Sequence, residues 1–256
     1  MRLRRAIETA LAAPDKNILL MTHLVLGYPS FATNRQVIAA MVKAGVDLIE
    51  LQIPFSEPVA DGPVILRANQ AALARGVRVE ECFRFAEAIC REFPIPFLFM
   101  TYYNIVFRYG EERFCQRAAE IGIQGAIVPD LPPEEGESFL ATARHHEIAP
   151  IMIFAPTSPD ERMRRLAAAG DGFVYCVARR GVTGAKTEMD TELAAYLNRC
   201  RQATDLPLAV GFGIGSRQDI AFLEGRAEIA VIGTKTIRLL EEKGVEAIGP
   251  FLADLR

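Results

Sequence analysis

The sequence predicts an α/β fold, built as a single (β/α)8 TIM barrel, and three observations support this prediction. The chain has 256 residues, half of them hydrophobic, which matches the usual size of such a barrel. Short apolar runs recur at intervals of roughly 20–45 residues, with amphipathic stretches between them, as strand–helix units require. Eight runs and eight stretches alternate, a count that favours a closed barrel over an open doubly wound sheet. We expect one domain, residues 1–256.

Each expected strand is a short apolar run, and in chain order the runs are Ile18–Leu24, Leu48–Ile53, Phe97–Thr101, Ala126–Val128, Pro150–Phe154, Phe173–Val177, Leu208–Val210 and Ile229–Ile232. The expected helices have apolar residues at helical spacing. In order they are Asn34–Ala44, Val79–Glu92, Glu111–Ile121, Glu134–His146, Pro159–Ala168, Thr191–Ala203, Ser216–Leu223 and Thr236–Glu242. Leu3–Ala12 predicts an extra N-terminal helix that closes the barrel's bottom, and Val245–Leu255 an extra C-terminal helix.

Composition excludes several function classes. The net charge of −3 gives no reason to expect binding to nucleic acid or to a membrane. No apolar signal core follows the basic N-terminus, and the longest apolar runs are too short to span a bilayer. The five cysteines lack C-x-x-C spacing and the three histidines form no metal signature, so we expect no metal. Four cysteines in helical patterns are expected to be buried thiols: Cys82, Cys90, Cys115 and Cys200. These features predict a cytoplasmic protein.

The most informative stretch runs from Glu50 through a Pro-rich loop to Asp61. Glu50 interrupts an apolar strand, where an unpaired buried carboxylate is costly. Active sites of barrels lie on the loops after the strands, so both acids can face the same mouth. Paired acids of this kind indicate general acid–base chemistry. The alternative is that Glu50 forms a salt bridge in the core and Asp61 caps a turn.

Glycines after the last two strands predict a phosphate site. Gly211–Gly215 follows the seventh expected strand, and Gly233-Thr234 follows the eighth. Glycine lets backbone N–H groups approach an anion, and barrels often bind phosphate at these two positions. The alternative is that these glycines serve only tight turns. Lys235 adds charge or is a solvated helix residue.

Two further features belong to the sixth strand. Tyr175 lies inside it and could direct a hydroxyl group into the pocket, or could be a core tyrosine. The loop Arg179–Gly184 that follows is rich in glycine, with one threonine. Such a loop can close over a substrate, although an ordinary surface loop explains the composition equally well.

Several motifs together resemble the tryptophan synthase alpha subunit family across nearly the whole chain. They are Ile49-Glu50-Leu51 with Pro54-Phe55-Ser56, Ala60-Asp61-Gly62-Pro63, Met100-Thr101-Tyr102-Tyr103-Asn104, Val128-Pro129-Asp130-Leu131-Pro132, Ala155-Pro156-Thr157, Gly181-Val182-Thr183-Gly184 and Gly211-Phe212-Gly213-Ile214. The resemblance implies retro-aldol cleavage of indole-3-glycerol phosphate to indole and glyceraldehyde 3-phosphate.

The resemblance also implies roles for individual residues. Glu50 matches the family's acid and base, Asp61 the acid that binds the indole N–H, and Tyr175 a tyrosine beside the reacting carbons. The implied substrate- and phosphate-binding residues are Thr183, Gly184, Phe212, Gly213, Gly233 and Thr234, with Thr183 also holding Asp61 when the loop closes. No metal or cofactor is implied in this chain. The implied partner is a pyridoxal-phosphate-dependent beta subunit in an α2β2 assembly, which receives indole through a tunnel.

The chain departs from the family pattern near the acids. Gln52 replaces a usual glycine, and His23 an apolar or aromatic pocket residue; we expect His23 to be a satisfied core histidine. Tyr28 and Glu57 each replace an aspartate. These departures leave open a free-standing indole-releasing lyase and a non-catalytic regulator of a beta chain. Another phosphate-binding barrel, such as an isomerase, is disfavoured because Glu50 is combined with the loop Pro54–Pro63.

Overall fold

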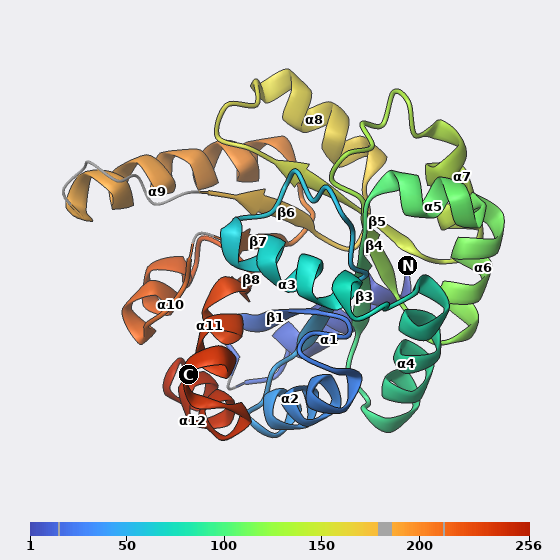
Figure 1. Cartoon of the computed structure of the whole chain (residues 1–256). Helices are drawn as coiled ribbons and strands as arrows, with labels where there is room; N and C mark the ends of the chain where they lie inside the picture. Colours follow the sequence, from blue (N-terminus) through green and yellow to red (C-terminus); the bar gives the residue numbers. More distant parts are fainter. Residues whose placement is uncertain (15, 179–185, 212) are drawn as a thin grey trace.

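Eight parallel strands close into a barrel in chain order, with β1 paired to β8, and helices surround it (Figure 1). The computed structural model describes residues 1–14, 16–178, 186–211 and 213–256, with side chains left undescribed at 186–190. The expected fold class is therefore confirmed. Thr183, Gly184 and Phe212 lie outside the described residues.

The strands agree with the expected runs to within one or two residues. They are β1 (Leu19–Val25), β2 (Leu48–Gln52), β3 (Phe97–Met100), β4 (Gly125–Ile127), β5 (Ala149–Phe154), β6 (Val174–Val177), β7 (Leu208–Gly211) and β8 (Ile229–Ile232).

All the expected helices are present in the described ranges, with shifted ends. They are α1 (Arg2–Leu11), α2 (Phe31–Lys43), α4 (Val79–Glu92), α6 (Glu111–Glu120), α7 (Glu137–His145), α8 (Asp160–Ala169), α9 (Lys186–Ala203), α10 (Arg217–Leu223), α11 (Thr234–Lys243) and α12 (Ile248–Asp254), the last preceded by a 3₁₀ turn, Val245–Ala247. The sequence analysis missed α3 (Pro63–Ala74) and α5 (Tyr103–Tyr109).

Both missed helices precede the helix that was expected after their strand, and of α3 only Pro63 belongs to the segment interpreted as a loop. Pro63 occupies the first turn of α3 after Gly62 at its N-cap. Proline is favoured there because its missing N–H has no helical partner to lose. The last proline of the expected loop therefore marks the start of a helix.

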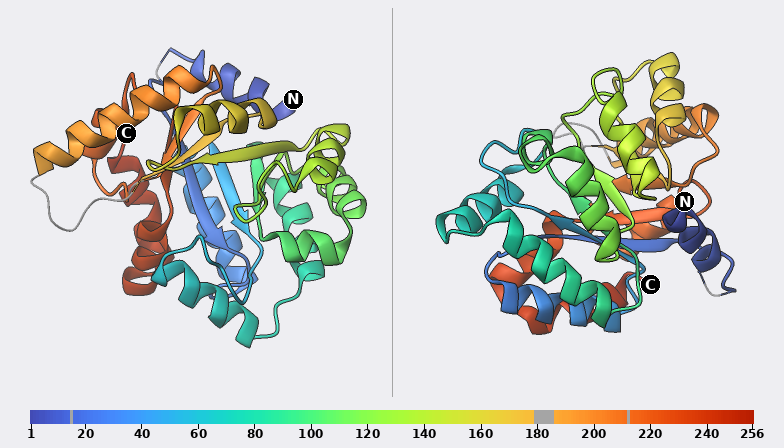
Figure 2. Two further views of the ribbon diagram at one scale, coloured as in Figure 1. Left: turned by 90° about the horizontal axis from the view of Figure 1, so that it is seen from above. Right: turned by 90° about the vertical axis from the view of Figure 1, so that its right-hand side faces the viewer.

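Helix α1 closes the N-terminal end of the barrel, as expected. Its buried Leu3 and Ile7 pack in one cluster with Leu19 of β1 and other inward-facing strand residues. A methyl group at Gly125 would lie 3.0 Å from a methyl carbon of Leu3. The right-hand view of Figure 2 shows α1, in dark blue beside the label N, next to the ends of the strands. The opposite end is left for the site.

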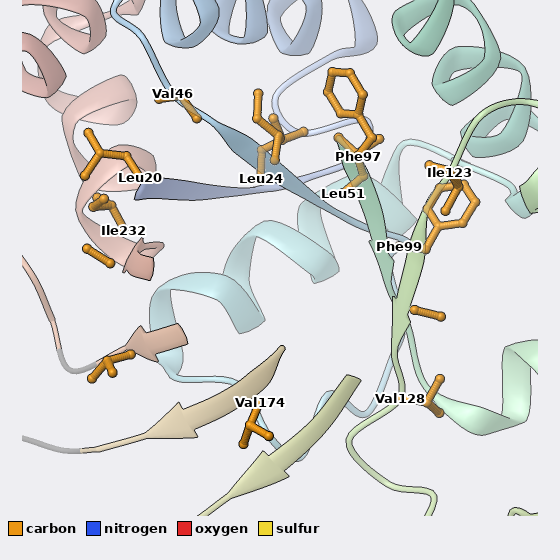
Figure 3. Close-up of a cluster of buried hydrophobic side chains, with 14 of the residues drawn as sticks. Leu20, Leu24, Val46, Leu51, Phe97, Phe99, Ile123, Val128, Val174 and Ile232 are labelled. Atoms are coloured by element: carbon orange, nitrogen blue, oxygen red, sulfur yellow. The ribbon is translucent and has the colours of Figure 1, made fainter. Parts of the chain in front are cut away.

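Alternation along the strands divides the core into two layers. In β1, Leu20 and Leu24 join the large cluster between the strands and the outer helices, whereas Met21 joins the cluster inside the barrel. Figure 3 shows Leu24, Phe97 and other side chains of the outer cluster. Because side chains alternate between faces, His23, two residues after Met21, faces the interior.

The cysteine prediction is correct for Cys82, Cys115 and Cys200, which are buried, whereas Cys90 is half-buried; Cys176 is also buried, and all five thiols are free. Within the described residues, no helix has the length and apolar character needed to cross a membrane.

Candidate active site

A cavity of about 500 Å³ opens at the C-terminal ends of the strands. It brings together most of the candidate site residues from widely separated parts of the chain. Its lining includes Glu50, Asp61, Tyr175, Gly213, Gly233 and Thr234, together with His23, Gly211 and Lys235.

Glu50 reaches this cavity because it lies on the inward face of β2. Its neighbours Ile49 and Leu51 pack into the outer cluster, so the alternation turns Glu50 inward. The residue is buried, and its Oε1 lies 3.0 Å from Nδ1 of His23. Among the described residues Oε2 has no hydrogen-bond partner. One carboxylate oxygen is thus held by the protein and the other is left without a protein partner.

Asp61 lies in the loop after β2, just before α3, and is held by two donors. Its Oδ2 accepts hydrogen bonds from Nε2 of Gln52, at 2.6 Å, and from the Tyr102 hydroxyl, at 3.0 Å. Burial raises the pKa of Asp61, while the nearby His23 and the two hydrogen bonds lower it; the net pKa remains above the usual range. The donors fix the carboxyl in position and moderate the effect of burial.

Tyr175 faces inward from β6 toward the two acids. A methyl group at Gly211 would lie 3.3 Å from the Tyr175 hydroxyl oxygen, so glycine leaves room for this ring. Burial, with further contributions from Glu50 and Asp61, raises the pKa of Tyr175 well above its usual value. The phenol therefore stays neutral and can donate a hydrogen bond.

The expected phosphate site lies in the same cavity, at the start of α11. Gly233 occupies the N-cap of that helix, and no side chain caps it. The first N–H groups of α11 therefore lack a capping acceptor, and the helix dipole favours an anion there. Gly213 has a φ of +88°, a left-handed conformation that favours glycine. Lys235 also lines the cavity and supplies positive charge.

The turn before α10 differs from the start of α11, because its backbone N–H groups already have an acceptor. Its backbone N–H groups at Gly215 and Ser216 both donate to the Asp219 carboxylate at 3.0 Å. These donors are already satisfied by an acid, so they are not available to an anionic ligand. Within the glycine-rich segment 211–215, Gly213 lines the cavity and is the described residue that best fits a phosphate site.

Sequence reasoning missed the contacts that hold the two acids. Tyr102 was part of a motif but received no role, and Gln52 was noted only as a departure. His23, expected to be a satisfied core histidine, is buried and its Nδ1 contacts Glu50, but its Nε2 has no hydrogen-bond partner among the described residues. The register, which places His23 opposite Glu50, is the signal that could have identified the pair.

Within the described residues, no group of three or more His, Cys, Asp or Glu side chains could hold a metal ion. The available chemistry is that of two carboxyls, a phenol, an imidazole and an open helix N-terminus. A closed barrel with such groups at the C-terminal ends of its strands is the architecture of a (β/α)8-barrel enzyme.

Comparison with known proteins places the chain within this class. The family model described as tryptophan synthase alpha chain matches residues 10–249. The tryptophan synthase alpha chain of Desulfotalea psychrophila is 64% identical over 242 residues, covering 94% of this chain and 95% of the relative. The chain belongs to the tryptophan synthase alpha chain family. It is a lyase of tryptophan biosynthesis, and the reaction of the family is cleavage of indole-3-glycerol phosphate.

Solved structures of tryptophan synthases are also similar to this chain. A Mycobacterium tuberculosis tryptophan synthase structure matches with a TM-score of 0.89 and 33% identity, covering 99% of this chain and 96% of that one. The tryptophan synthase complex from Pyrococcus furiosus matches with a TM-score of 0.85 and 30% identity, covering 93% and 97%.

Proposed function

We propose that the cavity cleaves indole-3-glycerol phosphate with Glu50 as general acid and base, Asp61 as the partner of the indole N–H, and the start of α11 as the phosphate site. The observation that carries this assignment is the shared cavity of about 500 Å³, which is lined both by the two acids and by the uncapped N-terminus of α11. A substrate that carries an aromatic ring and a phosphate group fits this combination of groups.

Glu50 performs two proton transfers in the proposed reaction. It donates a proton to C3 of the indole ring, so that the ring can accept the electrons of the breaking carbon–carbon bond. It removes the proton of the glycerol hydroxyl next to that bond, which becomes the aldehyde of glyceraldehyde 3-phosphate. The proton count at Glu50 is unchanged after one turnover. Its Oε2, which has no partner among the described residues, supports this role.

Asp61 and Tyr175 assist the aromatic end. Protonation at C3 creates positive charge at the indole nitrogen, and the Asp61 carboxylate stabilises that charge while accepting the N–H hydrogen bond. The contacts from Gln52 and Tyr102 keep Asp61 aimed before substrate binds. Tyr175, neutral and inward-facing, lies beside the reacting carbons. Such preorganised groups require little rearrangement during the reaction.

The phosphate group binds at Gly213, Gly233 and Thr234 in this proposal, with Thr183, Gly184 and Phe212 completing the site. Thr234 begins α11, where its backbone N–H is one of the donors without a helical partner. Thr183 would also contact Asp61 when its loop closes over the substrate.

Substitution of Glu50 tests the assignment. Because general acid–base catalysis typically contributes about 10²–10⁴-fold, Glu50→Gln should lower kcat by a factor in that range and leave KM nearly unchanged. The measurement is steady-state indole release. A kcat within threefold of the unmodified chain, or a loss confined to KM, would contradict the acid–base role.

We also propose that the chain works with a pyridoxal-phosphate-dependent tryptophan synthase beta subunit, in an α2β2 assembly, and itself holds no cofactor. Two large hydrophobic side chains in the described ranges are exposed, Val59 at 81% and Phe107 at 65%. They lie in the loop after β2 and in α5 after β3, so both are at the end of the barrel where the cavity opens. Exposed apolar side chains at that end fit a partner that receives indole.

The partner proposal is tested by mixing the chain with a tryptophan synthase beta subunit. The double substitution Val59→Ser and Phe107→Ser should weaken binding at least tenfold by calorimetry, since anchors of this kind contribute about 1–2 kcal/mol each. Arg91→Ser is the matched control, because Arg91 is 77% exposed but lies on α4 before β3, at the other end of the barrel. Light scattering of the mixture tests the α2β2 stoichiometry. Equal binding by all variants would place the partner surface elsewhere.

A further inference from the structure

His23 and Glu50 form a buried pair that the assignment of Glu50 alone does not explain. They lie directly opposite each other in the parallel register of β1 and β2, both on the inward face. The two side chains are 4% and 5% exposed, and Nδ1 lies 3.0 Å from Oε1. A contact of this length requires a proton between the two atoms. The pair is therefore built into the barrel and does not depend on a flexible loop.

The outer atoms of the pair are available to the cavity. Among the described residues, Nε2 of His23 and Oε2 of Glu50 both lack a hydrogen-bond partner. Buried polar atoms are almost always satisfied, so two orphans on one pair indicate a functional site. Gly233 at the N-cap of α11 lies beside His23, since a Cβ at Gly233 would be 3.7 Å from the His23 Cβ.

The charges around the pair favour an extra proton on it. Burial lowers the pKa of His23, but the Glu50 carboxylate, its hydrogen bond, the nearby Asp61 and the Gln52 side chain raise it, and the net pKa is above the usual value. The titratable groups that line the cavity around His23 are Glu50 from β2, Asp61 from the loop after it, Tyr175 from β6 and Lys235 from α11.

We propose that His23 is a positioning residue that shares one proton with Glu50 and so lets this carboxyl alternate between acid and base. The inference rests on the proposed role of Glu50. In one state Nδ1 holds the proton, and an imidazolium faces a carboxylate. In the other state the proton is on the carboxyl and the imidazole is neutral. Both states have the same net charge, so Glu50 becomes an acid without taking a proton from solvent.

The number of protons on the His23–Glu50 pair is the same before and after one turnover. The carboxyl takes the Nδ1 proton on Oε1, turns about its Cγ–Cδ bond to present that proton to indole C3, and as a carboxylate then accepts one proton from the glycerol hydroxyl. That proton returns to the shared position between Nδ1 and Oε1. No oxidant, reductant or further reactant is required.

The test compares His23→Phe and His23→Asn, with His145→Asn on the surface of α7 as a control. Asparagine keeps a donor near the Nδ1 position but cannot hold an extra proton. We expect both His23 variants to lose about tenfold or more in kcat, with KM nearly unchanged and an altered pH profile of kcat. Thermal unfolding identifies a variant that fails to fold.

A second measurement is independent of turnover. Nuclear magnetic resonance titration of the His23 ring, assigned with the variants, should show that Glu50→Gln lowers the pH at which His23 loses its proton. An unchanged His23 titration, or a normal kcat pH profile in both His23 variants, would overturn the inference. Normal turnover by Glu50→Gln would instead overturn the proposed function, so the two failures are distinguishable.

Discussion

Replacing Gln52 by leucine removes the shortest hydrogen bond to Asp61 and keeps the side chain at a similar size. The lost bond runs from Nε2 of Gln52 to Oδ2 of Asp61 at 2.6 Å, and the Tyr102 hydroxyl at 3.0 Å remains. A hydrogen bond to a charged group contributes about 1.5–3 kcal/mol. This energy stabilises the carboxylate form, because the Gln52 bond lowers the pKa of Asp61 against the effect of burial.

The expected result is a change in the pH dependence of activity. Since about 1.4 kcal/mol corresponds to a factor of ten, the ionised form of Asp61 loses roughly 10- to 100-fold in stabilisation. The pKa of Asp61 rises further, so the acid limb of the kcat/KM profile moves to higher pH. On that limb the variant should lose activity by the same factor, whereas at alkaline pH most of the loss should disappear.

Stability serves as the control for this prediction. The Gln52 side chain also has a buried Oε1 with no partner among the described residues, a penalty that leucine removes. The two effects offset each other, so the melting temperature should change by less than about 5 °C. Gln124→Leu is the matched control, because Gln124 has the same unpartnered Oε1 but lies before β4, at the opposite end of the barrel. An acid limb unchanged in Gln52→Leu would refute the reasoning.

Three further predictions follow from the structure. Leu3→Ala should lower the free energy of unfolding by about 2–5 kcal/mol without changing kcat, measured by chemical denaturation, because the fully buried Leu3 closes the end away from the site. Gly213→Asp should raise KM at least tenfold, since it places a charge beside the phosphate and a side chain at a φ of +88°; Gly213→Ala separates strain from charge, and an unchanged KM contradicts the phosphate assignment. Because the pKa of His23 is raised, protonation of His23 stabilises the fold below its usual pKa of about 6.5, and this contribution is lost as pH rises through the raised pKa. The stability difference between the unmodified chain and His23→Phe should therefore shrink from pH 6 to pH 9.

The barrel could be predicted well because the patterns that indicate its strands and helices are local in the sequence. The apolar runs and their spacing determine strand positions, and eight strand–helix units have few arrangements other than a closed barrel. The failures are α3 and α5, the additional helices before α4 and α6. Pro63 joins α3 to a Pro-rich loop, and α5 has only seven residues, too few for a clear helical period.

The candidate site was predictable where a residue's position in a strand or turn was sufficient. Glu50 and Asp61 were identified from a carboxylate in a buried strand and another in the loop after it. The partners of these acids depend on register between strands, which short-range patterns do not determine. His23 is 27 residues from Glu50 in sequence, and Tyr102 is 41 from Asp61, so neither contact has a local signal.

Two of the four departures from the family pattern lie at the acids. His23 contacts Glu50, and Gln52 contacts Asp61. Each acid therefore has a partner from a departing position, which is the basis for the proposed effects of these residues on proton transfer and orientation. A sequence comparison alone identifies the positions as unusual, whereas the contacts show which acid each one meets.

The most direct test of the account is indole release from indole-3-glycerol phosphate by the purified chain, alone and with a tryptophan synthase beta subunit. The account predicts indole release that increases when the beta subunit is present and falls about 10²–10⁴-fold in Glu50→Gln under both conditions. High activity that does not respond to the beta subunit would favour a free-standing lyase. Absence of indole release under both conditions, with the chain folded, would contradict the central claim that this cavity cleaves indole-3-glycerol phosphate.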